Sequence, residues 1–109
     1  MAWLLCDGQV LASLEVAETF AARSRGLLGR SVPEGAMLIR HARGVHSIGM
    51  RFSMDVAFLD ADLVVLDCLM LKPFRATRPR LRARSVLEAA EGAFERWGLK
   101  VGDRLEIKE

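Results

Sequence analysis

The most hydrophobic part of the chain is a pair of short runs, residues 54–60 and 63–71, that meet at Asp60-Ala61-Asp62. The second run is nearly continuous in Val and Leu, which is typical of a strand covered on both faces. Two such runs with a tight connection predict a central antiparallel hairpin. The two-residue period of a strand then places Val56 and Phe58 on one face, where we expect Phe58 to be buried.

Turn signals and alternating polarity extend the β prediction to the rest of the chain. Asp7-Gly8 is a strong hairpin signal. Further strands are predicted at residues 2–6, 9–17, 36–40, 81–88 and 104–108. Thr19 can cap a short helix that ends at Gly29, and a second short helix is predicted over residues 90–97. The pattern indicates a mainly β fold, a single compact antiparallel β-sandwich or barrel-like domain with two short helices.

Length and composition limit the class of protein. A chain of 109 residues suits one domain, residues 1–109. Its hydrophobic content of 51% argues against disorder. No apolar run approaches the ~20 residues that a membrane span needs. The N-terminus lacks the basic start of a signal peptide, so we expect a cytoplasmic protein that does not contact membranes.

The cysteine content argues against a disulfide framework. Cys6 and Cys68 are the only two cysteines, and both lie in apolar, strand-like runs. We expect two reduced thiols that behave as small hydrophobic side chains. The sequence contains no CxxC, HxH or HExxH pattern, so it predicts neither a metal site nor a cofactor.

The net charge of +2 hides a segregation of charge along the chain. Residues 19–51 hold six bases and one acid, and residues 72–84 hold six bases and no acid. The densest run comprises Arg75, Arg78, Arg80, Arg82 and Arg84. Alternation along this run would place four guanidinium groups on one strand face, where they could follow a phosphate backbone. Against this interpretation, Phe74 is the only aromatic residue nearby and no nucleic-acid-binding fold is evident. A solvated edge strand protected by its charges is the simpler alternative.

The stretch from residue 46 to residue 60 joins polar side chains to an apolar strand and is the first candidate site. His46, Ser47 and Asp55 are the residue types of a base, a nucleophile and an orienting acid. The serine lacks the GxSxG elbow of hydrolases, and His46 could equally bond a backbone carbonyl at the core edge. Asp55 is expected to pair with Arg51 or an arginine of residues 23–30, or to cap a turn.

Two weaker patterns have simple structural alternatives. His46, Met50 and Met54 could be soft ligands for Cu(I), but methionines in an apolar segment usually fill a core. The segment GLLGR, residues 26–30, has arginines beside its glycines and could hold an anion. Those arginines are Arg23, Arg25 and Arg30. The segment lacks the GxxxxGK[ST] spacing of a phosphate-binding loop, and glycines that end a helix explain the same letters.

Five motifs together carry a family resemblance. They are RSRGLLGR at 23–30, GAML at 35–38, Met50 followed by DVAFLD at 55–60, VLE at 86–88 with Gly92, and VGD at 101–103. In this order and spacing the sequence resembles the bacterial and archaeal family named domain of unknown function 192. The resemblance implies a compact β-sandwich-like domain and supplies no activity. Many relatives place Trp before the methionine and a Lys-Asn-Thr-like run after it, whereas here Gly49 precedes Met50 and Arg51-Phe52-Ser53 follows.

The sequence therefore favours a small cytoplasmic, non-enzymatic domain that binds a small ligand or a protein partner through GLLGR and the loop at 44–53. The candidate binding residues are Arg23, Arg25, Arg30, His46, Ser47, Arg51 and Asp55. One alternative is a hydrolase-type enzyme that uses His46 and Asp55. Another is a nucleic-acid-associated protein that uses the basic run from Arg75 to Arg84.

Overall fold

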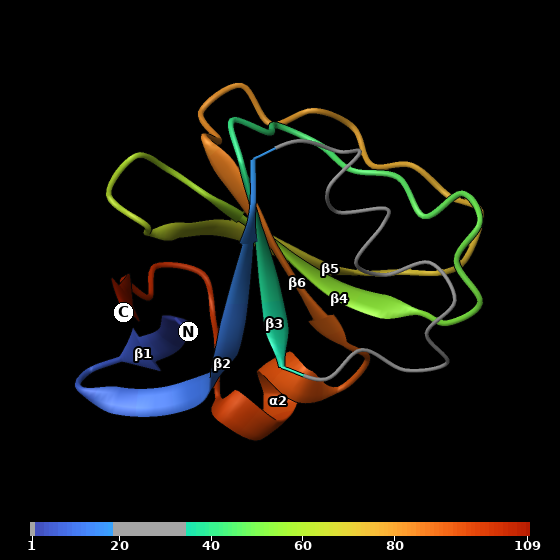
Figure 1. Cartoon of the computed structure of the whole chain (residues 1–109). Coiled ribbons are helices and arrows are strands. Elements are labelled where there is room, and N and C mark those ends of the chain that lie inside the picture. Colours follow the sequence, from blue (N-terminus) through green and yellow to red (C-terminus); the bar gives the residue numbers. More distant parts are fainter. Residues whose placement is uncertain (1, 19–34) are drawn as a thin grey trace.

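The structure is a computed structural model that describes residues 2–18 and 35–109, and these residues form one curled sheet (Figure 1). The strands are β1 (Ala2–Cys6), β2 (Gln9–Ala17), β3 (Ala36–Arg40), β4 (Met54–Leu59), β5 (Val65–Leu71), β6 (Ser85–Ala90) and β7 (Leu105–Lys108). They lie in the order β5-β4-β6-β3-β2-β1-β7. Neighbours are antiparallel except for β2 and β3, which run parallel. A short helix, α2 (Ala93–Trp97), precedes β7 in the chain.

Both predicted hairpins are confirmed, and their turns show why they form. Asp7 and Gly8 join β1 to β2 with φ angles of 52° and 78°, the left-handed values that a tight two-residue hairpin turn requires. Asp60 follows β4, and its Oδ1 accepts the N–H groups of Asp62 and Val64 at 2.8 and 3.0 Å. A carboxylate that accepts local N–H groups in this way fixes the chain reversal before β5.

The sheet curls until the segments that lead into its two edge strands meet. The N–H of Val65 donates to the carbonyl oxygen of Asp103 at 2.8 Å, and the N–H of Leu105 donates to that of Leu63 at 2.9 Å. These bonds join the start of β5 to the start of β7. The sheet is therefore a half-barrel that is closed by hydrogen bonds at one end.

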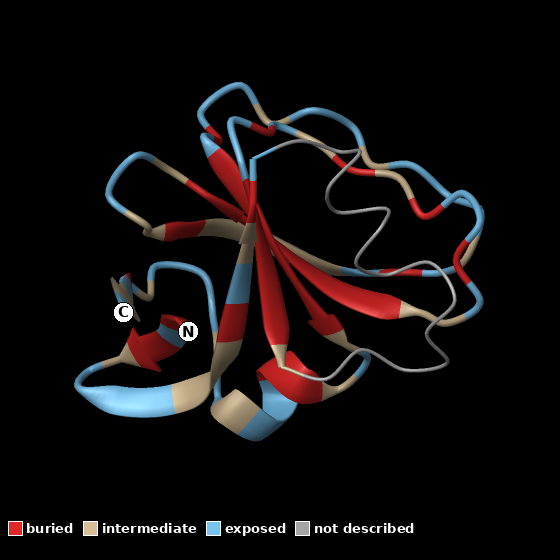
Figure 2. Cartoon of the chain, in the orientation of Figure 1, coloured by how far each residue is buried: buried red, intermediate tan, exposed pale blue. Residues whose placement is uncertain are grey.

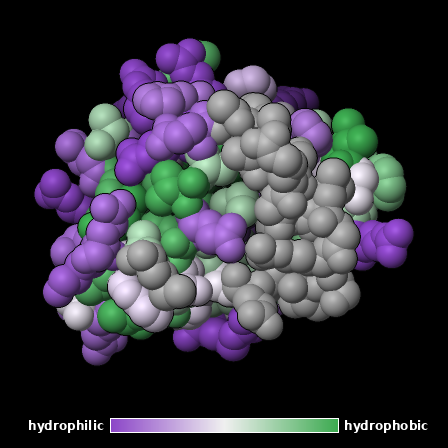
Figure 3. All heavy atoms as spheres, in the orientation of Figure 1, coloured by the Kyte–Doolittle hydropathy of each residue, from purple (hydrophilic) through white to green (hydrophobic). Residues whose placement is uncertain are grey.

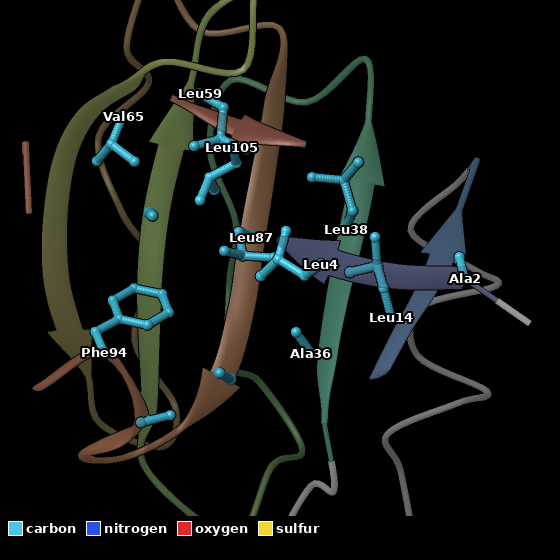
Figure 4. Close-up of a cluster of buried hydrophobic side chains, with 13 residues drawn as sticks. Ala2, Leu4, Leu14, Ala36, Leu38, Leu59, Val65, Leu87, Phe94 and Leu105 are labelled. Carbon is cyan, nitrogen blue, oxygen red and sulfur yellow. The ribbon is translucent and has the colours of Figure 1, made fainter. Parts of the chain in front are cut away.

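The inside of the curl holds a core to which all seven strands contribute (Figure 4). Its labelled members are Ala2, Leu4, Leu14, Ala36, Leu38, Leu59, Val65, Leu87, Phe94 and Leu105. Alternate residues of each strand point inward, as the two-residue period requires. Phe94 reaches this core from α2, so the helix covers one opening of the half-barrel.

The outer face of β3, β4 and β6 carries a second core, and these strands are almost wholly buried (Figure 2). Val56 and Phe58 both belong to it, and both are 0% exposed. The predicted burial of Phe58 is thus confirmed. Ala42, Val45, Met50 and Ala83 cover this face from the loops on either side of the central strands.

Three expectations need correction. The described part of the chain contains one short helix, so the prediction of two is not borne out; the first predicted helix falls within residues 19–34, outside the described residues. The strand predicted from residue 81 begins only at Ser85, because its partner β3 ends at Arg40, directly opposite. The single curled sheet matches the barrel-like alternative more closely than a two-sheet sandwich.

Candidate functional site

Two long loops cross the outer face of the sheet side by side (Figure 1). Residues 41–53 join β3 to β4, and residues 72–84 join β5 to β6. Each loop joins two strands that run in the same direction, and β3 and β4 run opposite to β5 and β6, so the chain passes in opposite directions along the two loops. We call residues 41–53 and 72–84 together the double loop.

Backbone hydrogen bonds tie the two halves of the double loop into a short antiparallel ribbon. The N–H of Ser47 donates to the carbonyl oxygen of Arg75 at 2.8 Å, and the N–H of Phe74 donates to that of Ser47 at 3.0 Å. Further along, the N–H of Thr77 donates to the carbonyl oxygen of Val45 at 2.9 Å. The ribbon is therefore a defined structure even though it belongs to no strand of the sheet.

The side chain of Ser47 links the two halves of the ribbon. The residue is 0% exposed. Its Oγ donates to the carbonyl oxygen of Lys72 at 2.6 Å and accepts the N–H of Arg75 at 2.9 Å. A buried hydroxyl that satisfies two backbone groups is in a structural role and cannot meet a substrate.

His46 lies beside an open groove between the two halves of the double loop. The groove has a volume of about 740 Å³, and its walls include His41, Arg43, His46, Thr77, Pro79 and Arg84. The Nδ1 atom of His46 accepts the N–H of Ile48 at 3.3 Å. His46 adjoins this groove, whereas neither Arg51 nor Asp55 lines it.

Asp55 belongs to the other face of the sheet. Its parity along β4 is that of Ala57 and Leu59, which lie in the inner core. Its Oδ2 accepts the N–H of Phe94 at 3.0 Å, in the first turn of α2, where Gly92 offers no side-chain cap. A carboxylate at that position accepts a hydrogen bond from an N–H group that has no partner within the helix. Its negative charge also interacts favourably with the positive end of the helix dipole. Asp55 therefore caps α2, and the sheet separates it from the double loop that carries His46.

The remaining predicted site residues divide into three groups. Met50 and Met54 are 2% and 1% exposed within the outer core, which is the structural alternative to copper ligation. Arg51 is exposed on the double loop. Arg23, Arg25 and Arg30 lie outside the residues that the structure describes. Within residues 2–18 and 35–109, no cluster of three His, Cys, Asp or Glu side chains could hold a metal ion.

The double loop concentrates positive charge. It carries eight Lys or Arg residues, two histidines and no Asp or Glu. The bases are Arg43, Arg51, Lys72, Arg75, Arg78, Arg80, Arg82 and Arg84. All except Arg80 are exposed. The prediction that the arginines from Arg78 to Arg84 alternate along one strand face is wrong, because these residues lie in a loop. The bases nevertheless cluster on the double loop.

Arg80 differs from the other arginines because it turns toward the sheet. Its Nη2 and Nε lie 2.8 and 3.1 Å from Oδ2 of Asp67 on β5. Its Cζ lies 4.4 Å from the centre of the Phe58 ring, a cation–π distance. Arg80 thus anchors the double loop on the outer core and is a structural residue.

The tip of the double loop carries exposed apolar side chains, which the sequence reasoning did not single out. Ile48 and Phe74 are each 63% exposed. Figure 3 shows hydrophobic surface at the right-hand edge, where the double loop ends, with hydrophilic surface nearby. Phe74 also has a φ of 59°, which lies in the left-handed region that bulky residues rarely adopt. The one signal in the sequence was an aromatic residue after Pro73 inside an all-basic segment.

Comparison with known proteins identifies the family. The sequence profile of DUF192, described as "Uncharacterized ACR", matches residues 4–107. The chain belongs to this family. A UPF0127 protein of Pyrococcus furiosus is 32% identical over 104 residues, which cover 90% of this chain and 89% of that protein. A UPF0127 protein of Pyrococcus horikoshii is 31% identical over 97 residues, which cover 84% of each chain. The family resemblance inferred from the five motifs is therefore confirmed.

Solved structures share the fold of this DUF192 member. A protein of unknown function from Novosphingobium aromaticivorans superposes with a TM-score of 0.75 at 21% identity, covering 96% of this chain and 82% of that one. A putative transcription regulator from Sinorhizobium meliloti also gives 0.75, at 24% identity, covering 96% and 90%. At these identities the likeness establishes the fold alone. The family is uncharacterised, so function must be argued from the surface of this chain.

Proposed function

We propose that this protein is a non-enzymatic binding domain that takes an anionic ligand or partner on its double loop. The observation that carries the proposal is the composition of that surface: seven exposed Lys or Arg residues and no acid on two hydrogen-bonded loops. Such a surface creates a positive potential that attracts and holds negative charge. The groove between the two halves of the double loop is the proposed binding site for the ligand.

The hydrolase alternative receives no support from the geometry. Ser47 is buried and its hydroxyl is occupied by two backbone groups. Asp55 is bonded to the start of α2 on the opposite side of the sheet from His46. A nucleophile, base and orienting acid must lie in one chain of hydrogen bonds, and these three do not.

The proposal places the protein in the cytoplasm on the basis of its thiols. Cys6 and Cys68 are both free, and their strands β1 and β5 are not neighbours in the sheet. Free thiols of this kind suit a reducing compartment.

Inorganic polyphosphate tests the proposed function, because it offers negative charge without any other chemistry. We expect binding at low salt that weakens steeply as the salt concentration rises. The variant R43A/R78A/R82A removes three exposed bases of the double loop and should bind more weakly with a shallower salt dependence. Isothermal titration calorimetry at several salt concentrations measures both effects.

The matched control removes the same charge elsewhere. The variant R96A/R104A/K108A alters three exposed bases, one on α2, one directly before β7 and one in β7, and it should bind polyphosphate almost as well as the parent protein. Equal losses in the two variants would mean that binding follows net charge alone and would refute a site on the double loop. Absence of polyphosphate binding at low salt would refute the proposal altogether.

A further inference from the structure

The tip of the double loop combines two features that do not favour folding. Phe74 exposes 63% of its surface, and Ile48, on the other half of the ribbon, exposes the same fraction. The two are held close because the N–H of Phe74 donates to the carbonyl oxygen of Ser47, next to Ile48. An exposed aromatic ring gains little from folding, so burial does not explain its position.

The backbone at Phe74 strengthens this argument. Its φ of 59° lies in the left-handed region, which only glycine adopts readily. Glycine would suit the turn after Pro73, yet the chain places a phenylalanine there. Strained conformations of bulky residues cluster at ligand sites, where the strain fixes a side chain for contact.

We infer that the double loop binds single-stranded nucleic acid, with the phosphates along its arginines and a base stacked on Phe74. The inference rests on the proposed function and names the partner of that same surface. Sites for single strands combine a basic groove that follows the backbone with aromatic side chains on which bases stack. The double loop supplies both parts along one ribbon: the groove at His46 and Arg84, and the exposed ring at its tip.

The composition and shape of the surface favour nucleic acid over the other anionic partners. Seven of the eight bases are arginine, whose planar guanidinium binds phosphate with two hydrogen bonds and also stacks on rings. A lipid bilayer would meet the apolar tip but, being a broad surface, could not enter the groove behind it. A single strand is narrow and flexible enough to contact both the groove and the tip.

Fluorescence anisotropy with labelled ten-nucleotide strands tests this inference. One strand is oligodeoxythymidylate, and the other is an abasic strand with the same number of phosphates. We expect the strand with bases to bind more tightly. F74L keeps an apolar side chain but removes the ring, and it should weaken binding of the thymidine strand by about 5- to 150-fold. It should leave binding of the abasic strand unchanged.

A second variant separates function from folding. F74G removes the ring and also relieves the left-handed strain, so its Tm should equal or exceed that of the parent while thymidine binding is lost. W3L is the matched control, because Trp3 is an exposed aromatic residue on β1, 41% exposed, and its replacement should not affect binding. A fall in Tm for F74G would make the ring structural and would overturn the inference.

The remaining outcomes distinguish the inference from the proposed function. Equal binding of the thymidine and abasic strands would overturn the stacking role and leave the anion-binding surface intact. Binding to phosphatidylglycerol vesicles that F74G abolishes, together with thymidine binding that F74G does not change, would replace nucleic acid by a membrane surface. Failure of both strands and of polyphosphate to bind would remove the inference and the proposed function together.

Discussion

Strand β4 and the double loop adjoin one another on the same face of the protein, yet they are opposites in composition. All six residues of β4 are buried, whereas seven of the eight bases of the double loop are exposed. Hydrophobic burial drives folding, so stability should reside chiefly in β4 and its neighbours. The double loop buries Ala42, Val45, Met50 and Ala83 in the outer core, but its exposed bases and exposed apolar side chains contribute little to folding. The stability of this fold and its proposed binding surface therefore depend on adjoining but different sets of residues, which variants should be able to affect independently.

The strongest test of this comparison is Phe58→Ala. The ring is 0% exposed and packs between the outer core and the guanidinium of Arg80. Its removal leaves a cavity, and we expect a loss of about 3–5 kcal/mol in the free energy of unfolding. That is a large share of the ~5–15 kcal/mol typical of a small domain. Urea denaturation measures the change.

Phe74→Ala is the matched control, because it makes the same substitution on the exposed tip. Its effect on the free energy of unfolding should stay within about 0.5 kcal/mol. Similar losses for the two variants would contradict this expectation, since the exposed ring would then contribute to stability as much as the buried one.

An intermediate effect is expected for Ser47→Ala, which acts within the double loop. The change leaves the carbonyl oxygen of Lys72 and the N–H of Arg75 without the hydroxyl that they share. Loss of these partners should cost about 1–3 kcal/mol, and the ribbon should loosen locally. Hydrogen exchange should show lower protection at the Arg75 amide while β4 amides keep theirs. Oligonucleotide binding should weaken as well.

Ser53→Ala is the control for this variant, since Ser53 lies at the end of the same loop and is half-buried. It should change neither the exchange of the Arg75 amide nor the binding. If Ser47→Ala instead lowers protection throughout β4, then the ribbon and the sheet unfold as one unit and the proposed separation is wrong.

The sequence was informative wherever local chemistry decides the structure. Asp7-Gly8 adopts the left-handed angles of its hairpin turn, and the β4–β5 hairpin forms at the predicted residues. The alternation at residues 81–84 failed because strand length depends on the partner, and β3 ends opposite Ser85. A local pattern contains no information about where a distant strand stops.

The site was only partly predictable for the same reason. The basic composition of residues 72–84 was visible in the sequence, where His46 was also a candidate residue. The pairing of that segment with residues 41–53 depends on hydrogen bonds such as Ser47 to Arg75, 28 residues apart. Asp55 was expected to pair with an arginine or to cap a turn, but its partner is the backbone N–H of Phe94, 39 residues away. Polar residues that are close in sequence can therefore face opposite sides of a sheet.

The smallest expected effect is on the reactivity of the Cys68 thiol, which reports how well the sheet shields this side chain. Burial raises the pKa of Cys68 on β5 from 9.0 to about 11, and the neighbouring Asp67 and Asp55 add to the shift. Only the thiolate reacts with iodoacetamide. At pH 8, a pKa raised by about two units leaves about 100-fold less thiolate. A more basic thiolate is also a better nucleophile, which offsets part of this loss. Cys68 should therefore react about tenfold more slowly than a free thiol.

The pH dependence of this reaction should differ between β5 and the double loop. Between pH 9 and about 11 the unfolded chain releases the Cys68 proton while the folded chain retains it, so the folded state loses stability as the pH rises through this window. The alkylation rate of Cys68 should keep rising across the same window. In a C6S/C68S background, A76C places a thiol on the exposed double loop, and its rate should level off at a lower pH than that of Cys68, because exposure and the neighbouring arginines favour the thiolate. Iodoacetamide labelling followed by mass spectrometry measures both rates. Identical pH profiles would mean that β5 shields its thiol no better than the double loop does, and that the two segments differ less in burial than the structure indicates.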